Sequence, residues 1–108
     1  MLRILLDECL PKKIKVDLIK YIVVTVPEAG WSGKKNGELL KLAEQNFDVF
    51  ITIDQNLVYQ QKLFDKQIAV IVLSAVTNRY LDVKQLMPKV DAVLSKINKG
   101  EIILIENK

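Results

Sequence analysis

The chain has 108 residues, of which 50% are apolar and 27% are charged, a composition that fits one folded domain and excludes a disordered chain. Its 16 Lys and Arg residues exceed its 13 Asp and Glu residues, and the resulting formal charge of +3 is compatible with a nucleic-acid partner. The absence of histidine excludes a Ser-His-Asp triad, a His-ligated zinc ion and an imidazole base. The single Cys9 excludes an internal disulfide and a cluster of Cys ligands. Catalysis would therefore use carboxylates, hydroxyls, amides, lysines, one thiol or a borrowed cofactor.

No apolar run reaches the roughly 18 residues of a membrane span. The first run, residues 2–6, is also short for the core of a signal peptide, and the acids Asp7 and Glu8 follow it directly. We therefore expect a cytoplasmic protein with no membrane partner.

Five short apolar runs, rich in Ile and Val, are typical of buried strands, because a strand covered on both faces is apolar throughout. These runs are residues 2–6, 22–26, 49–53, 68–73 and 102–105.

Segments with helical spacing separate the predicted strands. The expected helices begin at Pro11, run over 37–45 behind an Asn36 cap, follow Asp54 as far as residue 63, and run over 83–97 behind an Asp82 cap. The resulting order, βαβαβαβαβ, predicts an α/β fold in one domain over residues 1–108. We expect a small three-layer fold whose five-stranded parallel sheet has strand order 2-1-3-4-5 and helices on both faces.

Three acids follow the predicted strands at one edge of the sheet. Asp7 ends the first strand, Asp54 ends the third, and Glu38 opens the helix after the second. Ligands bind at the carboxyl ends of parallel strands, near the point where the strand order reverses. Converging carboxylates repel one another unless a cation lies between them, and Mg²⁺ or Mn²⁺ suits such oxygen ligands. The sequence therefore predicts a divalent-cation site that can activate water and stabilise a phosphodiester in transit.

Each acid also has a structural interpretation. Asp54 is equally well explained as the N-cap of the following helix, and Glu38 as an acid favoured by the dipole of the helix it opens. Asp7 is harder to explain in this way, because it ends a central buried strand. Glu8 is expected to be structural or to support the site by contacting its ligands, and Cys9 is expected to be a small packing residue, since the chain has no His to activate it.

Polar and basic residues near the same edge are weaker candidates. Asn56, two residues after Asp54, could assist a cation or phosphate. Trp31, in the long connection over 27–36, could stack on a base, although packing against the sheet is the more common outcome. Basic residues expected to hold a nucleic-acid backbone are Lys12, Lys13, Lys34, Lys35 and Arg79, although solvated lysines and arginines are the commoner case.

Several segments together resemble the DUF5615 family of PIN-like proteins over essentially the whole chain. The segments are LLDECLP at 5–11, GWSG at 30–33, NGELL at 36–40, FDVFITIDQNL at 47–57, IAVIVL at 68–73 and GEI at 100–102.

This resemblance implies a metal-dependent ribonuclease, and many such proteins are toxins of toxin–antitoxin pairs. It implies Mg²⁺ or Mn²⁺ as cofactor, RNA and a cognate antitoxin as partners, and often a homodimer. The acidic site of the family maps onto Asp7, Glu38 and Asp54, and Thr52 supplies the Thr of a Thr-x-Asp motif. Asn56 stands where many PIN nucleases have a fourth acid, which leaves a single-metal or inactive site open.

Two other functions remain open. A phosphoacceptor receiver domain would use Asp7 with Glu8, Asp54 as acceptor and Ser74 after the fourth strand. It would also need a Lys at the end of the fifth strand, where this chain has Glu106. The third possibility is a non-catalytic PIN-like module that binds another protein.

Overall fold

The computed structural model describes residues 2–59 and 67–106. Its elements, with η for a 3-10 helix, are β1 (Arg3–Leu6), η1 (Lys12–Leu18), β2 (Ile22–Thr25), α1 (Asn36–Asn46), β3 (Val49–Thr52), η2 (Gln55–Tyr59), β4 (Ala69–Ser74), α2 (Tyr80–Lys84), α3 (Met87–Leu94) and β5 (Ile102–Glu106). All five predicted strands are confirmed, and each end differs by at most one residue. Residues 60–63 of the predicted third helix lie outside the described residues.

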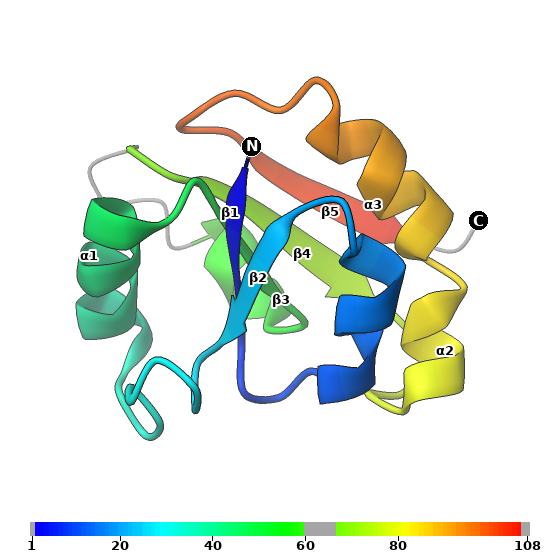
Figure 1. Ribbon diagram of the computed structural model, residues 1–108, viewed down its shortest axis with the longest axis horizontal. Coiled ribbons are helices and arrows are strands. Elements are labelled where there is room, and N and C mark those ends of the chain that lie inside the picture. Colours follow the sequence, from blue (N-terminus) through cyan, green and yellow to red (C-terminus); the bar gives the residue numbers. More distant parts are fainter. Residues whose placement is uncertain (1, 60–66, 107–108) are drawn as a thin grey trace.

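The strands form one parallel sheet in the order β2-β1-β3-β4-β5, which confirms the predicted topology. The chain passes from β1 to β2 on one side and later to β3 on the other side. The strand order therefore reverses between β1 and β3, and their carboxyl ends point to the lower edge of Figure 1. In a sheet of this order, that reversal is where a ligand site is expected.

The sheet is covered on both faces, which explains its continuous apolar strands. Ile4, Leu6 and Ile51 pack with η1, α2 and α3, whereas Leu5 and Phe50 point to the opposite face and pack with α1 and η2. Figure 1 shows α1 on one side of the sheet and η1, α2 and α3 on the other. Alternate side chains of one strand thus enter two different cores, so no position in the strand interior is left to a polar residue.

The predicted helix over 83–97 is instead two helices, α2 and α3, separated at Gln85 and Leu86. Pro88 lies in the first turn of α3. A proline lacks the backbone N–H and clashes with the carbonyl four residues earlier, so it is tolerated only where a helix begins. Asp82 lies inside the first turn of α2 and is not its N-cap, which is Arg79.

Across residues 2–59 and 67–106, none of the helices combines the length and the apolar character that crossing a membrane requires.

Candidate functional site

A buried hydroxyl joins two of the predicted site acids. The backbone N–H of Asp7 donates to the carbonyl of Ile51 at 2.9 Å, which extends the pairing of β1 with β3. The Oγ1 of Thr52, the fully buried last residue of β3, donates to Asp7 Oδ2 at 2.6 Å. The same oxygen accepts from the backbone N–H of Asp54 at 3.0 Å. Asp7 and Asp54 therefore lie on either side of Thr52, at the carboxyl ends of two neighbouring strands.

Asp54 combines a capping role with contacts to a second element. Its Oδ1 accepts from the backbone N–H of Asn56 at 3.0 Å, so it caps η2, as its structural interpretation requires. Its Oδ2 accepts from Asn36 Nδ2 at 2.9 Å. Asn36 was predicted to cap α1, but Lys35 occupies the N-cap position and Asn36 is the first residue of the helix.

Asn36 is thus a residue of the candidate site that the sequence analysis missed. Its side chain links the start of α1 to the end of β3 through Asp54. The signal was present, because Asn36 follows β2 at the same edge of the sheet as the acids. A side-chain amide in the first helical turn is free to face that edge when another residue occupies the cap.

Glu38 does not join the two aspartates. Its Oε1 lies 2.9 Å from Lys34 Nζ, and its side chain is 61% exposed. Within residues 2–59 and 67–106, no three His, Cys, Asp or Glu side chains are grouped so that they could hold a metal ion. In this arrangement of side chains Glu38 pairs with Lys34 and does not join Asp7 and Asp54 in such a group, so the predicted convergence of the three acids is not found among the described residues. The assignment of Glu38 to the metal stays a prediction.

The chemistry of the two remaining carboxylates suits a hydrated divalent cation. Each oxygen of Asp7 and Asp54 accepts one hydrogen bond from the chain, from Glu8, Thr52, Asn56 and Asn36 in turn. An ionised carboxylate offers about four lone-pair positions, so each side chain retains capacity for a ligand. Mg²⁺ commonly binds through one or two carboxylates, with water and substrate phosphates completing its shell. The donor set therefore fits Mg²⁺ or Mn²⁺ with two protein carboxylates.

Cys9 and Glu8 have structural contacts, as the sequence indicated. Cys9 Sγ is half-buried, at 4.0 Å from Thr52 Oγ1, and burial raises the pKa of this thiol above its usual value. A thiol that stays protonated at neutral pH is a weak nucleophile. Glu8 Oε1 accepts from the backbone N–H of Gly33 at 3.3 Å and so holds the connection before α1. Gly33 has φ +81°, a backbone conformation that residues other than glycine rarely adopt.

Trp31 lies in the same connection and packs against Phe47 at the end of α1. Its ring is half-buried and meets Phe47 edge to face, with ring centroids 6.0 Å apart and an interplanar angle of 87°. This is the packing role that the sequence favoured over stacking on a base.

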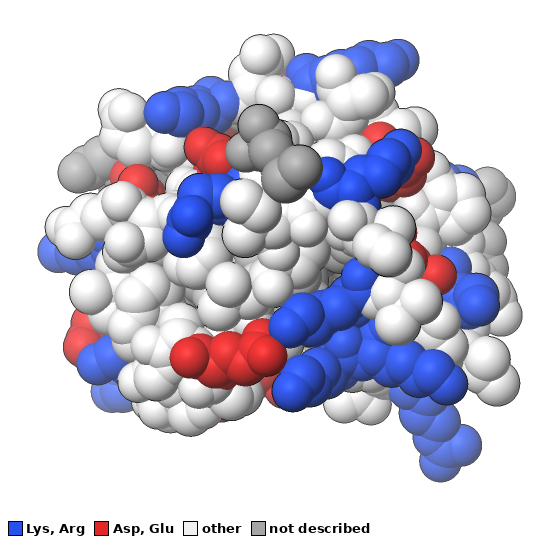
Figure 2. Space-filling model, in the orientation of Figure 1, with Lys and Arg blue, Asp and Glu red and all other residues white. Residues whose placement is uncertain are grey.

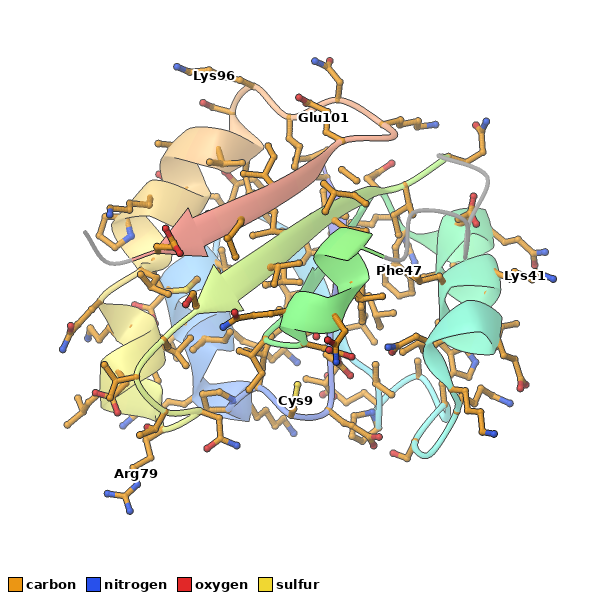
Figure 3. All side chains as sticks on the ribbon, turned by 180° about the vertical axis from the view of Figure 1, so that it is seen from behind. Cys9, Lys41, Phe47, Arg79, Lys96 and Glu101 are labelled. Atoms are coloured by element: carbon orange, nitrogen blue, oxygen red, sulfur yellow. The ribbon has the colours of Figure 1, made fainter. Side chains whose placement is uncertain are left out.

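The predicted basic residues lie on both sides of the acids but in different environments. Lys34 is half-buried and paired with Glu38, while Lys35 is exposed. Lys12 is 72% exposed and lies 3.6 Å from Glu28. Lys13 is also exposed, and Figure 3 shows Arg79 projecting outward at the same lower edge as Cys9.

The residues of the receiver alternative are only partly described. Ser74 Oγ accepts from Gln55 Nε2 at 3.3 Å, so it lies next to the start of η2. Strand β5 ends at Glu106, and residues 107–108 lie outside the described residues. The receiver alternative therefore stays untested.

A scan of the chain against models of protein families, a search of curated proteins and a search of solved structures each found no match. The resemblance to DUF5615 proteins consequently stays a prediction that rests on the quoted motifs.

Proposed function

We propose that this chain is a PIN-like endoribonuclease that hydrolyses RNA phosphodiesters with Mg²⁺ or Mn²⁺ held by Asp7 and Asp54. The supporting observation is the hydrogen-bonded series Asp7–Thr52–Asp54 at the point where the strand order reverses. The two carboxylates follow adjacent central strands, and each is held by hydrogen bonds, that of Asp7 from the buried Thr52 hydroxyl and that of Asp54 from Asn36 and the backbone of Asn56. Such a pair is preorganised to bind a hard cation.

The chain's own residues have distinct roles in this proposal. Thr52 binds the carboxylate of Asp7 and the backbone N–H of Asp54, and Asn36 orients the carboxylate of Asp54. Asn56 assists the cation or phosphate from the first turn of η2, where its backbone N–H donates to the Asp54 carboxylate. A bound divalent cation would supply Lewis-acid stabilisation of the phosphodiester and activation of water. In-line attack by water would leave a 5′-phosphate and a 3′-hydroxyl.

Glu38 has a conditional role, because it must first leave Lys34. Glu38 is 61% exposed, and an ion pair at such a surface position contributes only about 0.2–1 kcal/mol. An interaction of this size is weak enough for Glu38 to turn towards a cation bound by Asp7 and Asp54. Glu38 would then ligate that cation or position the attacking water.

The cellular part of the proposal rests on the family resemblance. We propose that the protein acts in the cytoplasm as the toxin of a two-gene pair, that a cognate antitoxin binds it, and that it forms a homodimer. A small antitoxin-like reading frame beside the gene would support this role.

The test is cleavage of mixed RNA by purified protein with Mn²⁺, using Asp7→Asn as the inactive variant and Asp48→Asn as a matched control. Asp48 lies at the opposite end of β3, and its replacement retains an oxygen for the backbone N–H of Arg3. Cleavage by the parent and by D48N but not by D7N supports the proposal. Equal cleavage by all three indicates a contaminant, and no cleavage by any favours the non-catalytic module. Phosphorylation of Asp54 by acetyl phosphate would instead support the receiver.

A further inference from the structure

One side of the candidate site carries a cluster of cations, which we call the η1–α2 basic surface. Its members are Lys12, Lys13, Arg79 and Lys84, all exposed. Two of them begin η1, one precedes α2 and one ends it. Figure 2 shows Lys and Arg side chains gathered at the lower right, over the position of η1 and α2 in Figure 1.

A tyrosine ring brings two of these cations together. Lys13 Nζ lies 4.9 Å from the centroid of the Tyr80 ring, and Lys84 Nζ lies 5.4 Å from it. The Tyr80 hydroxyl donates to Asp17 Oδ2 at 3.1 Å, which fixes the ring between η1 and α2. Each cation–π contact at an exposed site contributes about 0.5–1 kcal/mol, enough to bias the position of a lysine. Two ammonium groups from separate helices therefore lie at the same ring.

The cations of this surface are largely unneutralised. Lys12 lies 3.6 Å from Glu28, but Lys13, Arg79 and Lys84 form no ion pair with another described residue. Of the two predicted lysines on the opposite side of the site, Lys34 is bound to Glu38, and Lys35 is exposed and forms no ion pair with another described residue. The two sides therefore differ in the positive charge that they offer to an anion.

The η1–α2 basic surface also adjoins the acids. Asn78, in the loop that leads from β4 to α2, donates from Nδ2 to the backbone carbonyl of Cys9 at 3.3 Å. Cys9 is two residues after Asp7 in the connection from β1 to η1. The surface thus begins at the edge of the sheet that carries Asp7.

We propose that an RNA strand lies across the η1–α2 basic surface, with its phosphates contacting Lys13, Arg79 and Lys84, and reaches Asp7 from that side. The proposal rests on the proposed function for the choice of RNA as the polyanion. Ammonium and guanidinium groups without carboxylate partners make strong, charge-assisted contacts to phosphate. Tyr80 is a positioning residue, because it acts through the two lysines. Neither Lys84 nor Tyr80 was a candidate in the sequence analysis.

The test measures binding of a fluorescein-labelled single-stranded RNA by anisotropy in EDTA, so that cleavage by a divalent cation does not enter. The variant K13Q/K84Q removes two charges from the surface, and the control K41Q/K96Q removes two charges from exposed sites elsewhere (Figure 3). We expect K13Q/K84Q to lose about tenfold in affinity, with a salt slope smaller by about 1.4, because each lost phosphate contact removes about 0.7. The control should retain the parent's salt slope. Thermal unfolding of each variant establishes that it is folded.

A second variant tests the role of the ring. Tyr80→Leu removes the ring and leaves every cation in place, so we expect a severalfold loss of affinity with an unchanged salt slope. Tyr80→Phe keeps the ring and should bind more tightly than Tyr80→Leu.

Several outcomes would overturn the proposal: no RNA binding by the parent, unchanged binding by K13Q/K84Q, or an equal loss in K41Q/K96Q. Tighter binding to phosphatidylglycerol vesicles than to RNA, abolished in K13Q/K84Q, would assign the surface to a membrane and also overturn it. The two proposals fail separately. Binding through this surface without Mn²⁺-dependent cleavage contradicts only the nuclease, and cleavage by a K13Q/K84Q variant that binds normally contradicts only the surface.

Discussion

Strand β3 has an aspartate at each end, and the two side chains make different kinds of contact. At the amino end, Asp48 Oδ2 accepts from the backbone N–H of Arg3 at 2.8 Å. At the carboxyl end, Asp54 is linked through Thr52 to a second carboxylate, that of Asp7. Asp48 therefore satisfies the backbone of the neighbouring strand, whereas Asp54 belongs to a pair of acids. The acid at the carboxyl end, unlike Asp48, thus shares the Thr52 hydroxyl with a second acid.

The largest expected effect is on RNA cleavage, which should depend on Asp54 but not on Asp48. Asp7→Asn and Asp54→Asn should each lower Mn²⁺-dependent RNA cleavage by about 100-fold or more, because each removes one charged ligand. Asp48→Asn should leave the rate within about twofold, since its carboxylate serves only the backbone of β1. Initial rates with a labelled RNA, measured at saturating Mn²⁺, provide the comparison. Equal losses in D48N and D7N would contradict the distinction between the two ends.

The next effect concerns the hydroxyl that joins the acids. Thr52→Val preserves shape but leaves Asp7 Oδ2 and the backbone N–H of Asp54 without this partner. Because Thr52 is fully buried, we expect a loss of about 1–3 kcal/mol in the free energy of unfolding. Chemical denaturation measures this loss. Thr52→Ser keeps the hydroxyl and is the matched control. Equal stability of the two variants would show that the hydroxyl contributes nothing to the free energy of unfolding.

The amino end gives a smaller effect on stability and none on binding. Asp48→Ala removes the acceptor of the backbone N–H of Arg3, which lies near the surface and regains solvent as a partner. We therefore expect a loss of about 0.5–1.5 kcal/mol, the typical net value of one hydrogen bond. Isothermal titration with Mn²⁺ should give the same affinity as the parent. A weaker Mn²⁺ affinity in D48A would mean that the amino end of the strand influences the candidate site.

The sequence predicts the sheet and the neighbouring positions of Asp7 and Asp54 well, because both depend on backbone geometry. Apolar runs such as 49–53 fit only a strand that is covered on both faces. Once the strand order is 2-1-3-4-5, the neighbouring positions of Asp7 and Asp54 follow from the parallel pairing of their strands. Thr52 lies between them because it ends β3.

What the sequence did not predict depends on single side chains. Glu38 and Asn36 lie two residues apart on α1, and side chains at this spacing leave a helix on different sides. Asn36 contacts Asp54, whereas Glu38 pairs with Lys34 at the surface. Pro88 indicates the break between α2 and α3, because a proline is tolerated only where a helix begins. The prediction missed the break because the apolar residues keep helical spacing on both sides of that proline.

A third acid, Glu28, can be compared with Asp48 and Asp54 through the pH dependence of the free energy of unfolding. It follows β2, and a hydrogen bond from Lys15, followed by one from the backbone N–H of Thr25, lowers its pKa from 4.5 to about 2. The folded chain therefore binds this proton less readily than the unfolded chain. The stabilising effect is complete above about pH 4.5 and is lost as the pH falls towards 2.

Glu28→Gln removes this titration, so its stability should fall less steeply than the parent's between pH 4.5 and 2. The difference is expected to be the smallest of the four effects, since Glu28 is exposed and solvent screens its charge. Denaturant unfolding at several pH values measures it. Lys15→Met should flatten the same part of the profile, because it removes the largest cause of the lowered pKa. Identical slopes in the parent, E28Q and K15M would contradict the assignment, whereas flattening in both variants would show that this acid, like Asp48, serves the fold.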